Sequence, residues 1–346
     1  MIAPSSAFAS DNAAPAHPQV IDAIVAANTG AMPSYADDVV TGRAADALRA
    51  AFDSPDADVL FALTGTGANI VALAAAVRPW EQILCSDIAH VIVDEAGGVV
   101  RVSGATLTAL PSRDGIIDPA ELDRVIVARG VVHHSQPRVV TLTQSTENGR
   151  VWSPSAIGEF IAHAHQLGLL VHVDGSRIAN ATAALGVAPL TACGDADIIT
   201  VGGTKNGAMF GDALLVRRPA QFDGIRFVHK QIGHLASKHR FVAAQFAALL
   251  DDGLWLRLAA HANTMAARLS AGLVGRGAEL AVPTEANEVF VDLSPEVYAE
   301  LSQYYSVHKP DPLAPTVRFV CAWSTTADEI DELLQLYTGL PSAPSA

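Results

Sequence analysis

Cysteine is scarce in this chain: its 346 residues include three, at Cys85, Cys193 and Cys321. The three are far apart, odd in number and without the Cys-x-x-Cys spacing of metal sites and redox motifs. These features exclude a disulfide framework and argue against a zinc site, and no other metal is implied. We therefore expect a reducing, cytoplasmic environment.

Long hydrophobic runs and a targeting segment are also missing. No stretch reaches the roughly 18 apolar residues of a membrane-spanning helix. Residues Met1–Ser10 have neither a basic region nor a sustained apolar stretch, so we expect no signal peptide. Positive charge is limited, because 22 lysines and arginines face 36 acidic residues and leave a net charge of −14. This balance disfavours nucleic acid as a partner, and a cofactor phosphate would need a local cradle of backbone N–H groups and cations.

Hydrophobic residues, by contrast, are plentiful at 50%, with 17% charged residues. A chain of this length and composition predicts a globular protein of two domains. Short apolar strands alternate with helical segments, which predicts an α/β fold with a mainly parallel sheet that binds ligands at the carboxyl ends of its strands. The predicted strands are Val59–Leu63, Gln82–Cys85, Val139–Thr143, Leu169–Val173 and Ile198–Val201, between helices at Pro18–Asn28, Arg43–Phe52, Gly67–Ala76 and Ile157–Gln166.

The pattern changes after Phe222. The stretch Leu235–Leu269 has helical periodicity with one interruption, Gly253, and predicts a connector between domains. We accordingly expect a large domain at residues 1–245 and a smaller domain at residues 246–346. The smaller domain contains the predicted strands Glu288–Leu293 and Thr316–Val320 and the closing helix Asp328–Tyr337.

Lys205 is the residue with the most specific chemistry. It follows the strand Ile198–Val201 in a glycine-rich turn, and Asp174 follows the preceding strand, Leu169–Val173. An enzyme that uses pyridoxal phosphate (PLP) needs such a pair. The lysine forms a Schiff base, and the carboxylate keeps the pyridine nitrogen protonated so that the ring accepts electrons. A single lysine in a glycine loop is more often a surface residue, but strand, aspartate and spacing together favour PLP.

A second glycine-rich turn, Thr64-Gly-Thr-Gly-Ala-Asn69, follows the strand Val59–Leu63 and opens a helix. The backbone N–H groups around Gly65, Thr66 and Gly67 predict an anion site suited to a phosphate. The turn has no Gly-Lys-Ser/Thr of a nucleotide-binding P-loop and lacks the third glycine of the dinucleotide pattern. A plain strand-to-helix turn is the other interpretation.

Two histidine positions are candidates for catalysis. His90 follows the strand Gln82–Cys85 and is placed to stack on a planar cofactor, although a core or capping role is commoner for a single histidine. His133 and His134 precede the strand Val139–Thr143 and are either catalytic or solvated.

Three charged residues are candidates for ligand contacts. Glu147 and Arg177 lie in loops at strand ends. Arg318 lies inside the apolar strand Thr316–Val320, where a charge is costly unless it is paired. A substrate carboxylate is a suitable partner, because arginine binds carboxylates in a bidentate manner.

These motifs together resemble the low-specificity L-threonine aldolases, a family in the fold-type I (aspartate aminotransferase-like) group of PLP enzymes. The resemblance implies a mainly parallel, seven-stranded PLP-transferase type I large domain with a smaller C-terminal α+β domain. It runs almost end to end and is carried by Ser10-Asp11, Thr64–Asn69, Ala89-His90, Glu95–Gly98, Asp174–Arg177 and Thr204–Gly207. The chain departs from many members at Asn206, where they have glycine, and its segment Lys230–Arg240 is less rich in arginine.

The resemblance implies roles around the cofactor. Lys205 is similar to the Schiff-base lysine, and Asp174 to the partner of the pyridinium nitrogen. The segment Gly65–Gly67 matches the phosphate loop. His90 matches the histidine that stacks on the cofactor ring.

Roles toward the substrate are implied in the same way. Ser10, Arg177 and Arg318 resemble the groups around the cofactor phenol oxygen and the substrate α-carboxylate. His133 falls where the family places a second histidine near the β-hydroxyl. The base that takes the β-hydroxyl proton is then His90, His133 or a water held by them.

The implied reaction is cleavage of L-threonine, L-allo-threonine and related L-β-hydroxy-α-amino acids to glycine and an aldehyde. The alternatives are a phenylserine-type aldolase, another PLP lyase of the same fold, and a non-catalytic binding protein that kept the fold. Family members are typically dimers or tetramers. Tyr35 and Lys238 match regions that reach a neighbour's cofactor in relatives, so we expect a homo-oligomer.

Overall fold

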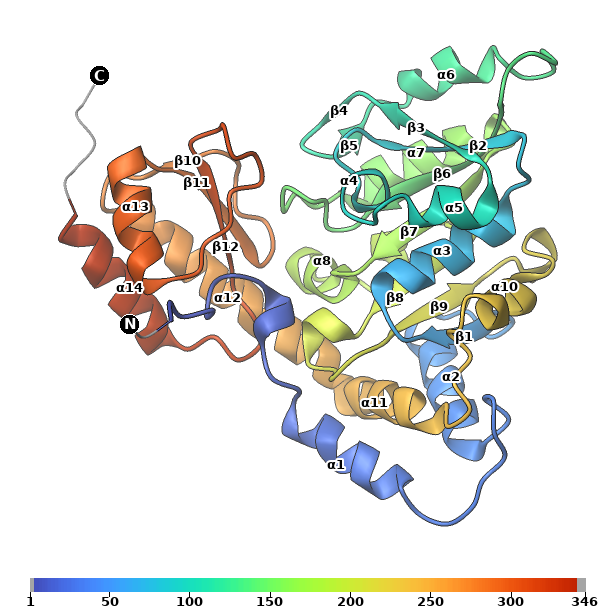
Figure 1. Cartoon of the computed structure of the whole chain (residues 1–346), viewed down its shortest axis with the longest axis horizontal. Helices are drawn as coiled ribbons and strands as arrows, with labels where there is room; N and C mark the ends of the chain where they lie inside the picture. The colour runs from blue at the N-terminus through green and yellow to red at the C-terminus, as the bar shows by residue number, and fades with distance from the viewer. Residues whose placement is uncertain (1–2, 341–346) are drawn as a thin grey trace.

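The computed structural model of the chain describes residues 3–340. Figure 1 shows a larger α/β unit on the right and a smaller unit on the left, joined by a long helix drawn in orange. The N-terminal end begins beside the smaller unit and then crosses to the base of the larger one. Within residues 3–340, no helix is long and apolar enough to cross a membrane.

A seven-stranded sheet forms the centre of the larger unit. Every neighbouring pair in it is parallel except the two pairs that involve β9 (Asp212–Val216), which runs antiparallel to both of its neighbours. The predicted mainly parallel, seven-stranded sheet is therefore confirmed. The strand order is β1 (Asp58–Ala62), β9, β8 (Ile198–Gly202), β7 (Leu170–Gly175), β6 (Gln136–Thr143), β2 (Glu81–Ser86) and β3 (Thr106–Leu110).

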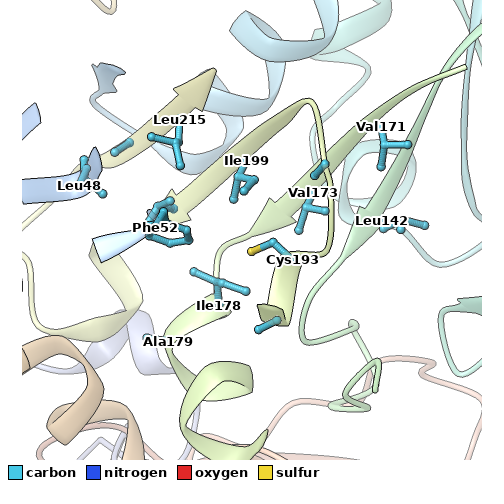
Figure 2. Close-up of a cluster of buried hydrophobic side chains, with 14 of the residues drawn as sticks. Leu48, Phe52, Leu142, Val171, Val173, Ile178, Ala179, Cys193, Ile199 and Leu215 are labelled. Atoms are coloured by element: carbon cyan, nitrogen blue, oxygen red, sulfur yellow. The ribbon is translucent and has the colours of Figure 1, made fainter. Parts of the chain in front are cut away.

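Helices cover both faces of this sheet, which explains why its strands are apolar on both sides. Figure 2 shows Val173 and Ile199 of the strands facing Ile178 and Cys193 of the helices on one face. That face is covered by α2 (Val39–Ala51), α7 (Pro154–Gln166), α8 (Ile178–Leu185), α9 (Pro189–Cys193) and α11 (Arg240–Leu250). The other face is covered by α3 (Gly65–Ala76), α5 (Gly98–Ser103) and α10 (Ile225–Gln231).

Local sequence signals fix where several helices begin. Thr64 caps α3, since its side chain accepts a hydrogen bond from the Gly67 N–H, and Ser153 caps α7 in the same way ahead of Pro154. The pattern misses β3 and β9, and it also leaves several short elements unassigned. Besides α5, α8, α9 and α10, they include η1 (Asp11–Ala13), α4 (His90–Val93), β4 (Ser112–Arg113), β5 (Ile116–Ile117), α6 (Ala120–Ile126), η2 (Thr204–Asn206) and η3 (Pro219–Gln221).

The predicted helical stretch Leu235–Leu269 is confirmed in its interruption at Gly253, but it begins later than predicted. Residues 235–239 are not helical, and the rest is divided into α11 and α12 (Leu254–Val274) by the short turn η4 (Asp251–Gly253). Asp252 has φ +48° and Gly253 has φ +64°, so the backbone leaves the right-handed helical region at both residues. The break allows α12 to leave the larger unit at a new angle.

The smaller unit is a three-stranded antiparallel sheet with helices packed on it. Its core contains Phe8, Leu269, Val289 and Phe319, so the N-terminal segment and the second half of α12 both belong to it. The first half of α12, at Leu254–Ala259, packs in the core of the larger unit instead. We therefore propose that the two domains meet inside α12 and not at 245/246, with residues near Phe8 added to the smaller one. Its elements are β10 (Glu279–Leu280), β11 (Glu288–Asp292), β12 (Thr316–Val320), α13 (Pro295–Tyr304) and α14 (Ala327–Thr338).

Candidate active site

A cavity of about 270 Å³ lies at the edge of the large sheet where the parallel strands end. Five of the predicted site residues line it together: Lys205, Asp174, His90, Gly65 and Thr66. Their roles remain predictions, but the structure brings them to one place.

Strand direction explains why these residues meet. β1, β2, β7 and β8 end at the same edge. Thr66, His90 and Lys205 follow β1, β2 and β8, and Asp174 is the last residue but one of β7. Asp212 also lines the cavity, but it reaches this edge from the first residue of the antiparallel strand β9. A search for polar residues that follow strands therefore overlooks Asp212.

Lys205 is held as a weakly bonded amine. Its only hydrogen bond among the described residues joins Nζ to Oγ of Ser176 at 3.4 Å, which is long. Burial lowers the pKa of Lys205, and the positive charge of Arg177 lowers it further. A lowered pKa increases the fraction of neutral amine, which is the nucleophilic form.

Asp174 is held as a carboxylate. Its Oδ2 accepts a hydrogen bond from Asn69 at 2.7 Å, and its Oδ1 accepts one from the Ser176 N–H at 3.0 Å. Burial acts to raise the pKa of Asp174, but the neighbouring His172 and Lys205 and these hydrogen bonds outweigh it, so that the pKa is lowered. An ionised carboxylate in a buried site is suited to pair with a protonated ring nitrogen.

His90 is oriented by Glu95. Glu95 Oε1 accepts hydrogen bonds from His90 Nδ1 and from Asn69 Nδ2, each at 2.8 Å. The proton of a neutral His90 therefore sits on Nδ1, which leaves Nε2 as the acceptor. The hydrogen bond to Glu95 is the main cause that raises the pKa of His90. The side-chain amide of Asn69 also donates to Asp174, so that Glu95 and Asn69 together connect His90 to Asp174.

Glu147 lies beside His90 and has an unusual environment. Its Oε1 accepts hydrogen bonds from the His90 N–H and the Thr143 hydroxyl, both at 2.8 Å. Its Oε2 is buried and has no hydrogen-bond partner among the described residues. Burial raises the pKa of Glu147 to about 7. The sequence marked Glu147 only as a possible ligand contact and gave no sign that it titrates near neutrality.

A chain of alternating charges lies next to the cavity. Arg177 donates two hydrogen bonds to Asp11, at 2.7 and 3.0 Å, and lies 3.4 Å from Glu288. Glu288 in turn lies 3.6 Å from Arg318. Arg177 is thus already paired with Asp11, which argues against its predicted role as a direct contact for a substrate carboxylate. Arg318, whose side chain is 23% exposed, is the more accessible of the two arginines.

The structure does not bring His133 to this cavity. His133 lies in an exposed turn that precedes β6, whereas the cavity lies at the opposite end of the parallel strands, where β6 ends at Thr143. Histidines that precede a parallel strand cannot reach the edge at which its neighbours end.

Four further predicted residues do not line the cavity: Arg177, Arg318, Ser10 and Gly67. The hydroxyl of Ser10 caps η1 by accepting a hydrogen bond from the Asn12 N–H, and Asn12 lines the cavity in its place. The Gly67 N–H is bonded to the Thr64 hydroxyl. A Cβ at Gly67 would lie 1.9 Å from the ring of His234, so a glycine here leaves room for that histidine.

Comparison with known proteins identifies the family of the chain. The family model for beta-eliminating lyases matches residues 7–296. The chain belongs to this family. Within it, the chain is 39% identical to a low-specificity L-threonine aldolase of a Pseudomonas species, over 95% of this chain and 96% of the relative. It is also 39% identical to that of Pseudomonas aeruginosa, over 94% and 95% of the two chains. The predicted membership of the threonine aldolase family is confirmed.

Solved structures agree with this assignment. A Leishmania major threonine aldolase superposes with a TM-score of 0.91 at 29% identity, over 96% of this chain and 98% of that one. A serine palmitoyltransferase of Sphingomonas wittichii superposes with a TM-score of 0.74 at 16% identity, over 96% and 86%, and shows a shared fold.

The cavity of this threonine aldolase family member fits PLP. It combines an amine of lowered pKa at Lys205 with a buried carboxylate at Asp174, the two groups that a pyridine aldehyde requires. The N–H groups of Gly65 and Thr66 open α3 and have no partner within the helix, so they suit the phosphate.

Proposed function

We propose that this protein cleaves L-threonine, L-allo-threonine and related L-β-hydroxy-α-amino acids to glycine and an aldehyde, with PLP as its cofactor. The observation that carries this proposal is the pairing of Lys205 and Asp174 in one cavity. The chain is also 39% identical to threonine aldolases over nearly its full length.

The residues that hold the cofactor follow from the site. Lys205 would form the covalent link, Asp174 would pair with the ring nitrogen, and the N–H groups of Gly65 and Thr66 would hold the phosphate. When bound, PLP withdraws electrons from the substrate Cα, which allows the Cα–Cβ bond to break.

The substrate is oriented by its carboxylate. Arg318 would bind the α-carboxylate and thereby set which bond at Cα is oriented for cleavage. Arg177 contributes through its fixed positive charge, because Asp11 holds its guanidinium in place. Orientation of the bond, rather than a difference in bond strength, selects cleavage between Cα and Cβ.

The β-hydroxyl proton passes to Nε2 of His90. This ring lines the cavity, and Glu95 fixes its other nitrogen at 2.8 Å. Glu95 also stabilises the imidazolium that forms when His90 accepts the proton, which makes His90 a stronger base. After cleavage, the proton that His90 has taken from the β-hydroxyl balances the proton that Cα receives when glycine forms.

Spectra and assays test this function. The purified protein is expected to be yellow with PLP and to release aldehyde from threonine, allo-threonine or phenylserine, measured by coupled reduction of the aldehyde. The ranking of the three substrates separates a threonine aldolase from a phenylserine-type aldolase. Cofactor uptake without cleavage of any of them would indicate a binding protein and would overturn the proposal.

We also propose that the protein is a homo-oligomer, a dimer or a tetramer. The Tyr35 N–H donates to the Ser237 carbonyl at 3.0 Å, and the Lys230 ammonium lies 4.3 Å from the Tyr35 ring centre. The two segments expected to reach a neighbour, around Tyr35 and Lys238, therefore form one exposed surface. Light scattering tests this, and a fully active monomer would contradict it.

A cytoplasmic location is proposed from the state of the cysteines. Cys85, Cys193 and Cys321 are buried and form no disulfide. Three unpaired thiols favour a reducing compartment. Cell fractionation tests this, and a secreted protein would contradict it.

A further inference from the structure

Glu288 of β11 is a buried carboxylate without hydrogen bonds. Its oxygens lie 3.4 Å from Nη1 of Arg177 and 3.6 Å from Nη1 of Arg318, too far for either contact to be a strong hydrogen bond. Neither Glu288 oxygen has a hydrogen-bond partner among the described residues, and the same holds for Nε of Arg318 and Oδ1 of the neighbouring Asn287. Buried polar atoms are normally paired, so four unpaired atoms in one cluster indicate a site that a ligand completes.

The balance of charges in this cluster leaves Glu288 as the partner of Arg318. Arg177 already has a carboxylate partner, because Asp11 accepts two hydrogen bonds from it and is itself fixed by Asn287 at 3.1 Å. With Asp11 and Arg177 matched, Glu288 is the counter-ion that remains for Arg318. The four groups are electrically neutral when Glu288 is ionised.

Other charged groups reach Glu288 or its partners from the elements around it. The charge of Lys205 lowers the pKa of Glu288, and the charge of Glu147 raises the pKa of Arg177. The charge of Asp94 raises the pKa of Arg318, and the charge of Arg318 lowers the pKa of His308. Burial lowers the pKa of Lys205, so this amine compensates for a further carboxylate less well than a guanidinium does.

Arrival of a substrate carboxylate at Arg318 adds one negative charge to this neutral group. If Glu288 stayed ionised, two carboxylates would share one guanidinium in a buried site, which is strongly unfavourable. Uptake of one proton by Glu288 restores neutrality and turns one oxygen into a hydrogen-bond donor. Burial raises the pKa of Glu288 even before a ligand arrives, despite the opposing positive charges of Arg177 and Arg318.

We propose that Glu288 is the internal counter-ion of Arg318 and takes up one proton from solvent when a carboxylate ligand binds there. This inference rests on the proposed function, in which Arg318 receives the α-carboxylate. It makes Glu288 a positioning residue that couples carboxylate recognition to pH. Between the pKa of Glu288 in the ligand-free protein and its higher pKa in the complex, affinity for a carboxylate falls about tenfold per pH unit, because one proton is bound with each ligand.

The experiment uses 3-hydroxybutyrate, which is threonine without its amino group, so that no amine titration confuses the pH profile. Its binding to the PLP-loaded protein is measured by calorimetry over a pH series from about 6 to 9. Buffers of different ionisation enthalpy give the number of protons taken up per ligand. Glu288→Gln is the test variant, because its amide resembles the protonated acid in shape and charge.

Glu285→Gln is the matched control. Glu285 lies three residues before Glu288 in the sequence and pairs with Arg150 at 2.8 Å, outside the cluster. The control removes the same charge from the same segment and is expected to keep the wild-type pH profile. Thermal melting shows whether each variant remains folded.

The expected result is uptake approaching one proton by the wild type and by Glu285→Gln, and none by Glu288→Gln, whose affinity stays constant across the series. Equal proton uptake by wild type and Glu288→Gln would overturn the inference, as would pH-independent binding by the wild type. Failure of the wild type to bind 3-hydroxybutyrate at any pH would also overturn it. The cleavage assay on L-threonine decides the proposed function separately.

Discussion

Glu147→Gln is expected to make the cofactor-free protein more stable at alkaline pH and to leave it nearly unchanged at acid pH. The reason is the burial that raises the pKa of Glu147 from 4.5 to about 7. Unfolding releases Glu147 into water, where it ionises near its ordinary pKa. Between about pH 4.5 and 7 the folded protein therefore holds a proton that the unfolded chain has lost.

The sign and size follow from this difference. Stability due to the protonated Glu147 is fully present below its unfolded pKa and is lost as pH rises through the folded value. A shift of this size corresponds to about 3 kcal/mol at most. Glutamine stays neutral and still accepts the hydrogen bonds from the His90 N–H and the Thr143 hydroxyl. The free energy of unfolding of the variant should therefore increasingly exceed that of the wild type as pH rises, and the difference should be constant above pH 7.

Urea unfolding of both proteins at a series of pH values measures this. Glu285→Gln is the control, because it removes a carboxylate from a half-buried position. Its stability should change with pH as that of the wild type does. A difference between Glu147→Gln and wild type that does not change with pH would refute the reasoning. So would a variant that is less stable than wild type at alkaline pH.

Three further predictions concern the site and its support. Lys205→Ala should lower cleavage on the order of 10³-fold or more and abolish borohydride trapping of PLP on the protein, and trapping that persists would place the cofactor on another lysine. Asp174→Asn should bind PLP but lose most of its turnover, because an amide cannot keep the ring nitrogen protonated; normal turnover with a lowered melting temperature would instead indicate a capping role. Gly67→Ala should cost about 1–3 kcal/mol, because its Cβ would lie 1.9 Å from the His234 ring, and equal stability of this variant and wild type in denaturant would contradict the steric argument. Gly42→Ala, a control at a position in α2 with nothing within 4 Å, should be neutral or stabilising.

Most of the correct site predictions came from residues at the ends of predicted strands. Lys205, Asp174 and His90 each follow an apolar run, and parallel strands bring their carboxyl ends to one edge, so that their meeting could be predicted. The same rule fails for Asp212, because β9 is antiparallel and presents its first residue to that edge. It would also have excluded His133, which precedes its strand, had the resemblance not suggested otherwise.

The sequence by itself determined the fold class and the pair Lys205 and Asp174, because these depend on local hydrophobic patterns and on chemistry carried by single residues. Only the tertiary structure decided which polar residues neutralise one another. Asn69 reaches Asp174 across 105 residues, and Asp11 pairs with Arg177 across 166. No local pattern records such a pairing, because the free energy of a buried charge depends on partners that chain folding alone brings near. For that reason the roles of Glu147, Glu288 and Arg177 became visible only in the folded protein.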